Sequence, residues 1–207
     1  MYVPEPFAET RVSVLHEAMR RIALATLVTA GEGGIAASHV PMLIDPDPAP
    51  YGTLLGHIAR DNPQWRGGAG EALAIFLGPD TYVSPSWYPS KAKHGRVVPT
   101  WNYVAVHARG RVEFFDDAAR LEALVTRLTA AHEAGKPRPW APSDAPRDYL
   151  EAMLTAIVGF ALPIARLEGK WKMSQNRPPE DRAGVGRALR AAGEDEIADL
   201  VEMPKGK

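Results

Sequence analysis

The chain has 207 residues, a length that suits one domain of ordinary size and is short for two independent cores. Hydrophobic residues make up 45% and charged residues 24%, so the composition is globular and excludes a disordered or fibrous protein. Lys and Arg number 24 against 25 Asp and Glu, and a net charge of -1 gives no electrostatic support to DNA binding. The absence of cysteine excludes disulfides, thiolate metal sites and a cysteine nucleophile.

The N-terminal residues carry neither the basic region nor the apolar core of a signal peptide. No apolar run approaches the roughly 20 residues of a membrane span. We therefore expect a cytoplasmic protein without a membrane partner. No repeat and no long linker interrupts the chain, so we expect a single domain over residues 1–207.

The first half of the chain alternates short apolar runs with turn residues, which is typical of an α+β fold that is mainly β. Apolar residues at helical spacing predict an opening amphipathic helix. We expect a helix over 10–21, followed by strands over 22–29 and 35–44 that are joined by a turn at 31–34. Short strands are expected over 53–57 and 72–77, with residues 82–83 as a continuation or a further strand. A longer strand is expected over 104–115, with a bulge at Gly110.

The second half carries longer helical patterns. Asp116 or Asp117 can cap a helix that runs to Ala131. A second helix is predicted over 149–158, ended by Gly159, and residues 161–174 return to an extended pattern. The chain closes with a helical hairpin over 181–203, turned at Gly193.

Common catalytic motifs are incomplete in this sequence. The segment Gly31-x-Gly33-x-x-Ala36 resembles a dinucleotide fingerprint, but Pro41 lies where the required helix would run, so we interpret it as a hairpin turn. His16-Glu17 and His132-Glu133 each lack the second histidine of a zinc protease, and no metal site is predicted. No Gly-x-Ser-x-Gly elbow is present to hold a serine nucleophile.

Two segments of the first half combine polar groups with buried strand patterns. Residues 37–41 place Ser38 and His39 inside an apolar strand. Residues 56–65 run from a strand end into a polar turn, where Asp61 or Asn62 can cap a helical turn and Arg60 adds a fixed charge. Exposed backbone N–H groups and a guanidinium together suit a phosphate, although a surface turn with a solvated arginine has the same pattern.

Two further segments mix aromatic, proline and hydroxyl residues. Residues 82–89 and 98–103 flank a basic span over 91–96, and their composition is typical of a pocket for a planar ligand or of a hydrophobic corner. In an extended segment 169–177, Lys170, Lys172 and Ser174 would share one face. Two like charges there indicate an anion between them, or an edge strand protected against aggregation.

Together these segments resemble a known family. Met1-Tyr2-Val3-Pro4, Ser38-His39-Val40-Pro41, residues 56–65, Ser84-Pro85-Ser86-Trp87-Tyr88, residues 98–103 and residues 169–177 resemble, in order and over almost the whole chain, the PaiB-type FMN-binding negative transcriptional regulators. The resemblance implies an FMN-binding split β-barrel of Greek-key type, six-stranded or a close variant, with packed helices. It also implies a homodimer with FMN at the subunit interface.

The resemblance implies non-covalent FMN rather than FAD, because no dinucleotide loop is present for a second phosphate. Haem is an alternative by analogy with other split barrels, since His39, His57 and His107 are available. The phosphate would lie against Arg60, Lys170 or Lys172. The implied cofactor-binding residues are Ser38, His39, Pro41, His57, Ala59, Arg60, Asn62, Gln64, Trp87, Tyr88, Thr100, Trp101, Asn102, Tyr103, Lys170, Lys172, Ser174 and Gln175.

Two functions follow from a bound flavin. A binding module would couple FMN or its redox state to a protein or nucleic-acid partner, as the regulator family implies. An oxidoreductase would pass hydride from NAD(P)H to a small oxidised substrate, with His39 and Tyr88 as candidate proton donors. The acidic second half of the terminal hairpin would repel DNA phosphates, so we expect weak DNA binding, and the basic span at 91–96 is predicted to be a lid or an anion funnel.

Overall fold

The structure, a computed structural model, describes residues 1–31 and 33–203. The chain divides into two compact units, each of which is treated by itself. Unit 1 comprises Met1–Thr10, Leu77–Val106 and the chain from Glu168, and unit 2 comprises Arg11–Phe76 and His107–Leu167. The single domain expected from the sequence stays a prediction.

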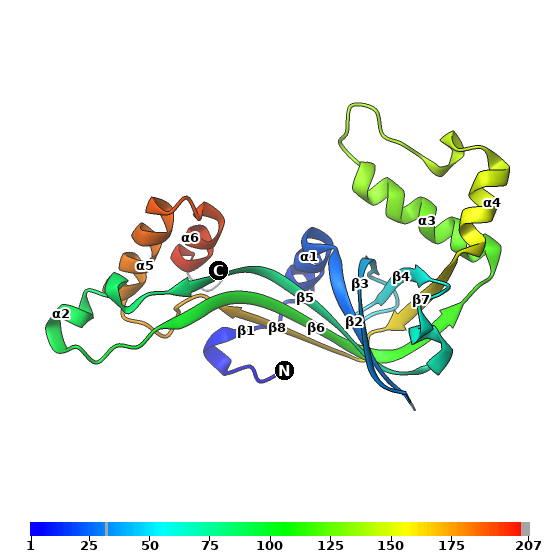
Figure 1. The fold of residues 1–207 in the computed structure, drawn as a ribbon. Coiled ribbons are helices and arrows are strands. Elements are labelled where there is room, and N and C mark those ends of the chain that lie inside the picture. Colours follow the sequence, from blue (N-terminus) through cyan, green and yellow to red (C-terminus); the bar gives the residue numbers. More distant parts are fainter. Residues whose placement is uncertain (32, 204–207) are drawn as a thin grey trace. The chain divides into compact units, whose positions relative to one another are not determined.

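The described residues contain strands, helices and short 3-10 helices in the order drawn in Figure 1. The strands are β1 (Ala8–Glu9), β2 (Leu24–Gly31), β3 (Gly34–Asp45), β4 (Thr53–Ala59), β5 (Gly70–Val83), β6 (Thr100–Phe115), β7 (Ile157–Pro163) and β8 (Arg166–Lys172). The helices are α1 (Val12–Ile22), α2 (Ser90–His94), α3 (Ala118–Glu133), α4 (Arg147–Thr155), α5 (Pro179–Ala191) and α6 (Asp195–Glu202), with 3-10 turns η1 (Glu5–Phe7), η2 (Pro63–Gly67), η3 (Pro85–Trp87) and η4 (Pro142–Asp144).

Unit 2 is built on a closed antiparallel barrel. The sheet order β1-β8-β6-β5-β2-β3-β4-β7, with a further β6–β7 pairing, joins the last strand back to β6. The ring β6-β5-β2-β3-β4-β7 therefore has six strands, which confirms the expected barrel. Hairpin β2–β3 pairs in register from Leu24↔Pro41 to Gly31↔Gly34, as the hairpin interpretation predicted, and Glu32 of its turn lies outside the described residues.

Alternating strand residues fill the barrel. Leu27, Leu54, Phe76 and Phe160 are almost completely buried, as expected where one face of every strand points inward. Glycine allows one close contact inside the barrel: a Cβ at Gly56 would lie 2.5 Å from the Phe160 ring. Outside the barrel, α1 packs against β3, and α3 lies beside α4 (Figure 1).

Unit 1 packs two helices on strand segments. The terminal hairpin α5–α6 buries Val185, Leu189 and Val201 against Val83 and Val104 of β5 and β6 (Figure 1). Gly193 turns the hairpin with a φ of 79°, a value that glycine adopts without steric cost. The predicted C-terminal helical hairpin is thus confirmed.

The structure decides one open alternative and corrects two boundaries. Residues 82–83 continue β5, the first of the two alternatives predicted, whereas β6 begins at Thr100 rather than at residue 104. The predicted helix over 149–158 ends at Thr155, because Ile157 and Val158 pair with Ala59 and Ile58 in β7. None of the described helices is long and apolar enough to cross a membrane.

Candidate functional site

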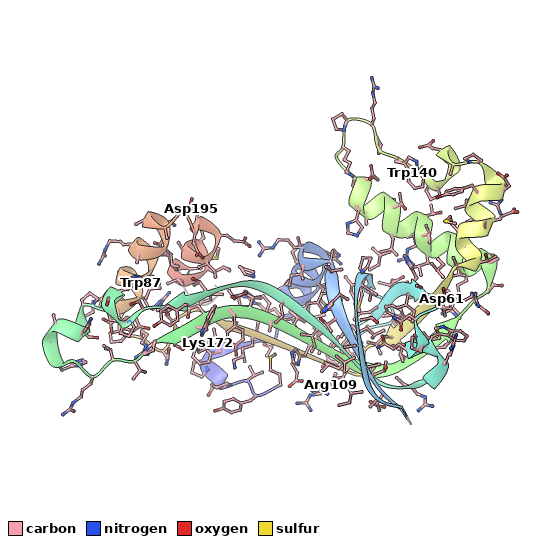
Figure 2. All side chains as sticks on the ribbon, in the orientation of Figure 1. Asp61, Trp87, Arg109, Trp140, Lys172 and Asp195 are labelled. Carbon is pink, nitrogen blue, oxygen red and sulfur yellow. The ribbon has the colours of Figure 1, made fainter. Side chains whose placement is uncertain are left out.

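The predicted site residues fall into two groups, one in each unit. Figure 2 shows the side chains on the ribbon, with Lys172 and Trp87 labelled in unit 1. Unit 2 holds Ser38, His39, Pro41, His57, Ala59, Arg60, Asn62 and Gln64. Unit 1 holds Trp87, Tyr88, Thr100, Trp101, Asn102, Tyr103, Lys170, Lys172, Ser174 and Gln175.

A hydrogen-bond network joins Ser38, Asn62 and Gln64 in unit 2. The Ser38 hydroxyl donates to Gln64 Oε1 at 2.6 Å and accepts from Asn62 Nδ2 at 2.8 Å. Asn62 caps η2 by accepting from the Gln64 N–H, as predicted. Gln64 Nε2 donates to the Leu27 carbonyl at 3.0 Å and to Thr29 Oγ1 at 3.2 Å. The network therefore holds η2 against hairpin β2–β3.

A hollow of about 600 Å³ lies next to this network. Part of its wall is bare backbone, since six of the thirteen lining residues are glycines. A Cβ built on Gly31, Gly33 or Gly67 would meet no atom within 4 Å, so packing within the chain does not require glycine there. A bare backbone facing open space is a surface that a ligand can approach closely. The lining residues are Thr29, Ala30, Gly31, Gly33, Gly34, Ala36, Pro63, Gln64, Arg66, Gly67, Gly68, Gly70 and Val112.

The guanidinium of Arg60 is held by hydrogen bonds and an ion pair within unit 2. Its Nε donates to the Thr155 carbonyl at 2.6 Å and its Nη2 to the Ile157 carbonyl at 3.2 Å. Its Nη1 lies 3.4 Å from Asp116 Oδ2. A phosphate at Arg60, as the sequence predicted, would have to share the guanidinium with these three acceptors. Arg60 also lines a second hollow of about 720 Å³ between α3 and α4, where Arg147 pairs with Glu122.

The remaining unit 2 candidates differ in their surroundings. His39 is exposed, and its Nδ1 lies 2.9 Å from Thr26 Oγ1. Pro41 pairs with Leu24 where hairpin β2–β3 begins, and Ala59 is exposed at the end of β4. The Nδ1 atom of His57 is buried and has no hydrogen-bond partner among the described residues.

Burial of His57 predicts an acid-sensitive fold. Desolvation lowers the pKa of His57 below its ordinary value of 6.5. The unfolded chain therefore binds a proton at a higher pH than the folded chain, and stability falls as the pH drops below about 6.5 towards the folded pKa. We expect His57→Gln to weaken this loss, and thermal unfolding between about pH 5 and 8 measures it.

The matched control is His132→Gln, on an exposed position of α3. We expect it to leave the pH dependence unchanged. An acid-induced fall in melting temperature that is the same in His57→Gln and in the unaltered chain would contradict the assignment to His57.

The aromatic candidates of unit 1 occupy both exposed and buried positions. Trp101 is 54% exposed and meets Tyr82 edge to face, with ring centroids 6.1 Å apart. Tyr88 is buried beneath the Arg177 guanidinium, which lies 4.8 Å from the ring centroid. Burial raises the pKa of Tyr88, and Arg177 opposes this shift, so the phenol is protonated at neutral pH. Trp87 is half-buried at the end of η3.

The polar candidates of unit 1 lie close together where β6 begins and β8 ends. Lys172 Nζ donates to Thr100 Oγ1 and to the Trp101 carbonyl. Asn102, which is fully buried, donates from Nδ2 to Ser174 Oγ at 3.0 Å. Lys170 lies over the Tyr103 ring at 5.2 Å, and Gln175 donates from Nε2 to the Trp171 carbonyl. The structure thus brings together the residues of two segments separated by about 70 positions.

Sequence reasoning missed two features of the site. Glycines 67, 68 and 70 were not considered, although a second glycine cluster after a strand end is a visible signal. Arg177 was not assigned a role, because an extended alternation gives no reason for it to return towards Lys172. Residues 1–31 and 33–203 contain no group of three or more His, Asp or Glu side chains that could hold a metal ion.

Comparison with solved structures identifies the class of fold to which the barrel belongs. The fold is similar to that of the flavocytochrome Anf3 from Azotobacter vinelandii, with a TM-score of 0.60 at 15% identity, over 86% of this chain and 75% of that chain. This likeness establishes the fold, a split β-barrel. The predicted fold class is therefore confirmed.

Sequence similarity then gives the family. Residues 1–166 match the family described as "Putative FMN-binding domain", and the chain belongs to it. The chain is 30% identical over 209 residues to the protease synthase and sporulation protein PAI 2 of Bacillus subtilis, covering 100% of this chain and 98% of that protein. It is 34% identical over 232 residues to an uncharacterised protein of Aspergillus fumigatus, covering 89% of each. The resemblance to the PaiB-type family is confirmed, and FMN is the cofactor.

The residues present fit this cofactor. Glycines that no packing contact requires line a hollow whose volume lies within the range of small-molecule sites. Gln64 is held by the network beside it, so a polar side chain at its wall has a fixed orientation. A bound flavin would supply hydride or electron transfer at this place.

Proposed function

We propose that the protein is a homodimer that holds FMN non-covalently at the subunit interface and acts as a PaiB-type regulator. The glycine-lined hollow of unit 2 carries the flavin part of the proposal, because six glycines leave part of its wall without side chains and a ligand can approach the backbone there. Among the described residues, the glycine segment that resembles a dinucleotide fingerprint leads into strand β3 (Gly34–Asp45) rather than into a helix, and this favours FMN over FAD.

Exposed apolar side chains support the dimer. Leu77 is 63% exposed and lies in the same unit as Trp101, and Ile35 of unit 2 is 82% exposed. Large apolar side chains exposed on strands are commonly covered by a partner, and a second copy of the chain supplies one by twofold symmetry. Sedimentation at micromolar concentration tests this, since a dimer is expected and a monomer would contradict it.

An oxidoreductase is the second candidate. Tyr88 favours it, since a buried, protonated phenol beside a guanidinium is a group that can donate a proton to a reduced substrate. Anaerobic mixing with NADH or NADPH distinguishes the two functions. Rapid bleaching of the flavin would favour the enzyme, whereas no bleaching together with a shift of a promoter fragment at physiological salt would favour the regulator.

The basic segment on and after α2 provides a test of DNA binding. Lys91, Lys93, His94 and Arg96 are all exposed, and Lys93 Nζ pairs with Glu180 at 2.6 Å. We expect the combined substitution of Lys91, Lys93 and Arg96 by alanine to leave FMN content nearly unchanged and to alter affinity for an anionic substrate or partner. Flavin absorbance per chain and ligand titration measure these two effects.

This expectation assumes that the dimer binds DNA weakly and with little sequence preference, as the net charge of -1 indicates. If the triple variant instead kept its flavin and lost a tight, sequence-specific interaction with operator DNA, the basic segment would be a DNA-reading surface. The assumption of weak DNA binding would then be wrong.

A further inference from the structure

The second hollow of unit 2 opens over the small core between α3 and α4, two helices that pack on each other (Figure 1). Leu121 and Leu154, which belong to a buried cluster, form its floor. Ala118 and Ala119 in the first turn of α3 line it as well, and both are exposed. Because these two side chains are short, a volume of about 720 Å³ stays open, which lies within the range of small-molecule sites. None of its lining residues belongs to the glycine-lined hollow.

The charged side chains of this hollow are paired with one another. Arg147 of α4 donates from Nη1 to Glu122 Oε1 at 2.6 Å and from Nε to Glu151 Oε1 at 2.8 Å. Arg60 is held by Asp116 and two carbonyls, as described above. Two arginines therefore accompany three carboxylates, and the N-terminal end of α3 adds a partial positive charge. Since a charge removed from water is costly unless it is paired, a lining this close to neutral favours a ligand without net charge.

The flat faces of the two guanidiniums remain available for contact. Hydrogen bonds to a guanidinium lie in its plane, so they fix its orientation without covering its faces. Within residues 1–31 and 33–203, neither Arg60 nor Arg147 lies over an aromatic ring. Arg120 of the same unit shows the alternative, since its guanidinium carbon lies 3.7 Å from the centroid of the Phe115 ring. An arginine held in this way at the wall of an apolar hollow offers a stacking surface to an aromatic ligand.

We propose that the hollow binds an uncharged aromatic compound, which packs on Leu121 and Leu154 and stacks on the guanidinium of Arg147. The apolar floor supplies the hydrophobic contact, and the planar cation adds a cation–π contact that an aliphatic ligand would not make. A phosphate compound is disfavoured, because its charge would meet three carboxylates. The site is separate from the proposed flavin site and does not depend on it.

The test uses the full chain and two fluorescent probes that share the same rings. N-Phenylnaphthylamine is uncharged, whereas anilinonaphthalene sulfonate carries an added sulfonate. Both are titrated by the increase in fluorescence that accompanies transfer from water to an apolar site. We expect the uncharged probe to bind about tenfold more tightly or better. Equal affinities, or a preference for the sulfonate, would contradict the assignment to an uncharged ligand.

The double variant Ala118→Leu and Ala119→Leu fills the hollow from α3. We expect the affinity for N-phenylnaphthylamine to fall by about tenfold or more, because the leucine side chains would occupy the space of the rings. The matched control is Ala123→Leu with Ala130→Leu, two exposed positions of α3 outside the hollow, and it should bind as the unaltered chain does. Thermal unfolding establishes that both double variants are folded. An unchanged affinity in the folded, filled variant would overturn the site.

The variant Arg147→Lys tests the stacking contact, because it keeps the positive charge and removes the planar face. We expect the affinity for N-phenylnaphthylamine to fall by about threefold. Arg127→Lys is the matched control, since Arg127 pairs with Asp45 at 2.9 Å and does not line the hollow. No loss in Arg147→Lys, or an equal loss in both variants, would contradict the contact with Arg147.

A titration with FMN separates this site from the proposed flavin site. We expect FMN to leave the uncharged probe in place and to bind the filled variant as tightly as it binds the unaltered chain. Displacement of the probe by FMN would overturn the separate site. A chain that binds the probe in this hollow but no FMN would overturn the proposed function and support this site.

Discussion

The double substitution Gly31→Leu and Gly67→Leu is expected to abolish FMN binding while the chain remains folded. Both glycines line the hollow of unit 2, and neither has a positive φ or an atom within 4 Å of a built Cβ. Leucine side chains would therefore enter open space rather than the core, and they would occupy the volume that a flavin needs. We expect FMN affinity to fall by about 100-fold or more, which corresponds to ~3 kcal/mol.

Fluorescence titration with FMN measures this loss, and thermal unfolding shows that the fold is retained. Ala130→Leu is the matched control, because Ala130 is exposed on α3 of the same unit and does not line the hollow. An unchanged FMN affinity in the folded double variant would mean that the flavin does not use this hollow.

The second large effect concerns two glycines of one helix. A Cβ on Gly184 of α5 would lie 2.1 Å from the Trp87 carbonyl oxygen and 3.0 Å from Pro89, so Gly184→Ala must push α5 away from η3. We expect a loss of about 2–3 kcal/mol in the free energy of unfolding. The positions of Trp87 and Tyr88 would change with it, because the Trp87 carbonyl meets Gly184 and Tyr88 shares a buried cluster with Val185 of α5.

Gly186→Ala in the same helix is the control with the opposite expectation. Its Cβ would meet the end of the Glu202 side chain, which is flexible and half-exposed on α6. Since alanine is the better helix former, this variant should be unchanged or more stable by up to about 1 kcal/mol. Denaturant unfolding of the two variants checks the pair. Equal stabilities would show that α5 does not pack tightly on η3.

Local patterns predicted much of the barrel. Hairpin β2–β3 could be recognised because alternating apolar residues flank a glycine turn, and both determinants are local. The helix predicted over 149–158 was too long, because local patterns alone could not assign its last residues. Short apolar runs such as Ile157-Val158 suit a helix or a strand equally, and only the pairing with β4 decides between them.

The site was predictable in composition but not in geometry. The segments containing Gln64, Trp101 and Lys172 were recognised from their residue types. The approach of Arg177 to Lys172 could not be predicted, because it depends on the left-handed backbone of Ser174, which no local pattern required. The glycine-lined hollow likewise depends on η2 folding against hairpin β2–β3 through Gln64.

The most direct test of the central claim is a titration of the purified, flavin-free protein with FMN. The account predicts saturable binding of about one FMN per chain, released intact when the protein is acid-precipitated, because the flavin is held without a covalent bond. Absorbance of the released flavin measures both properties. A protein that stays colourless and shows no saturable FMN binding would contradict the account.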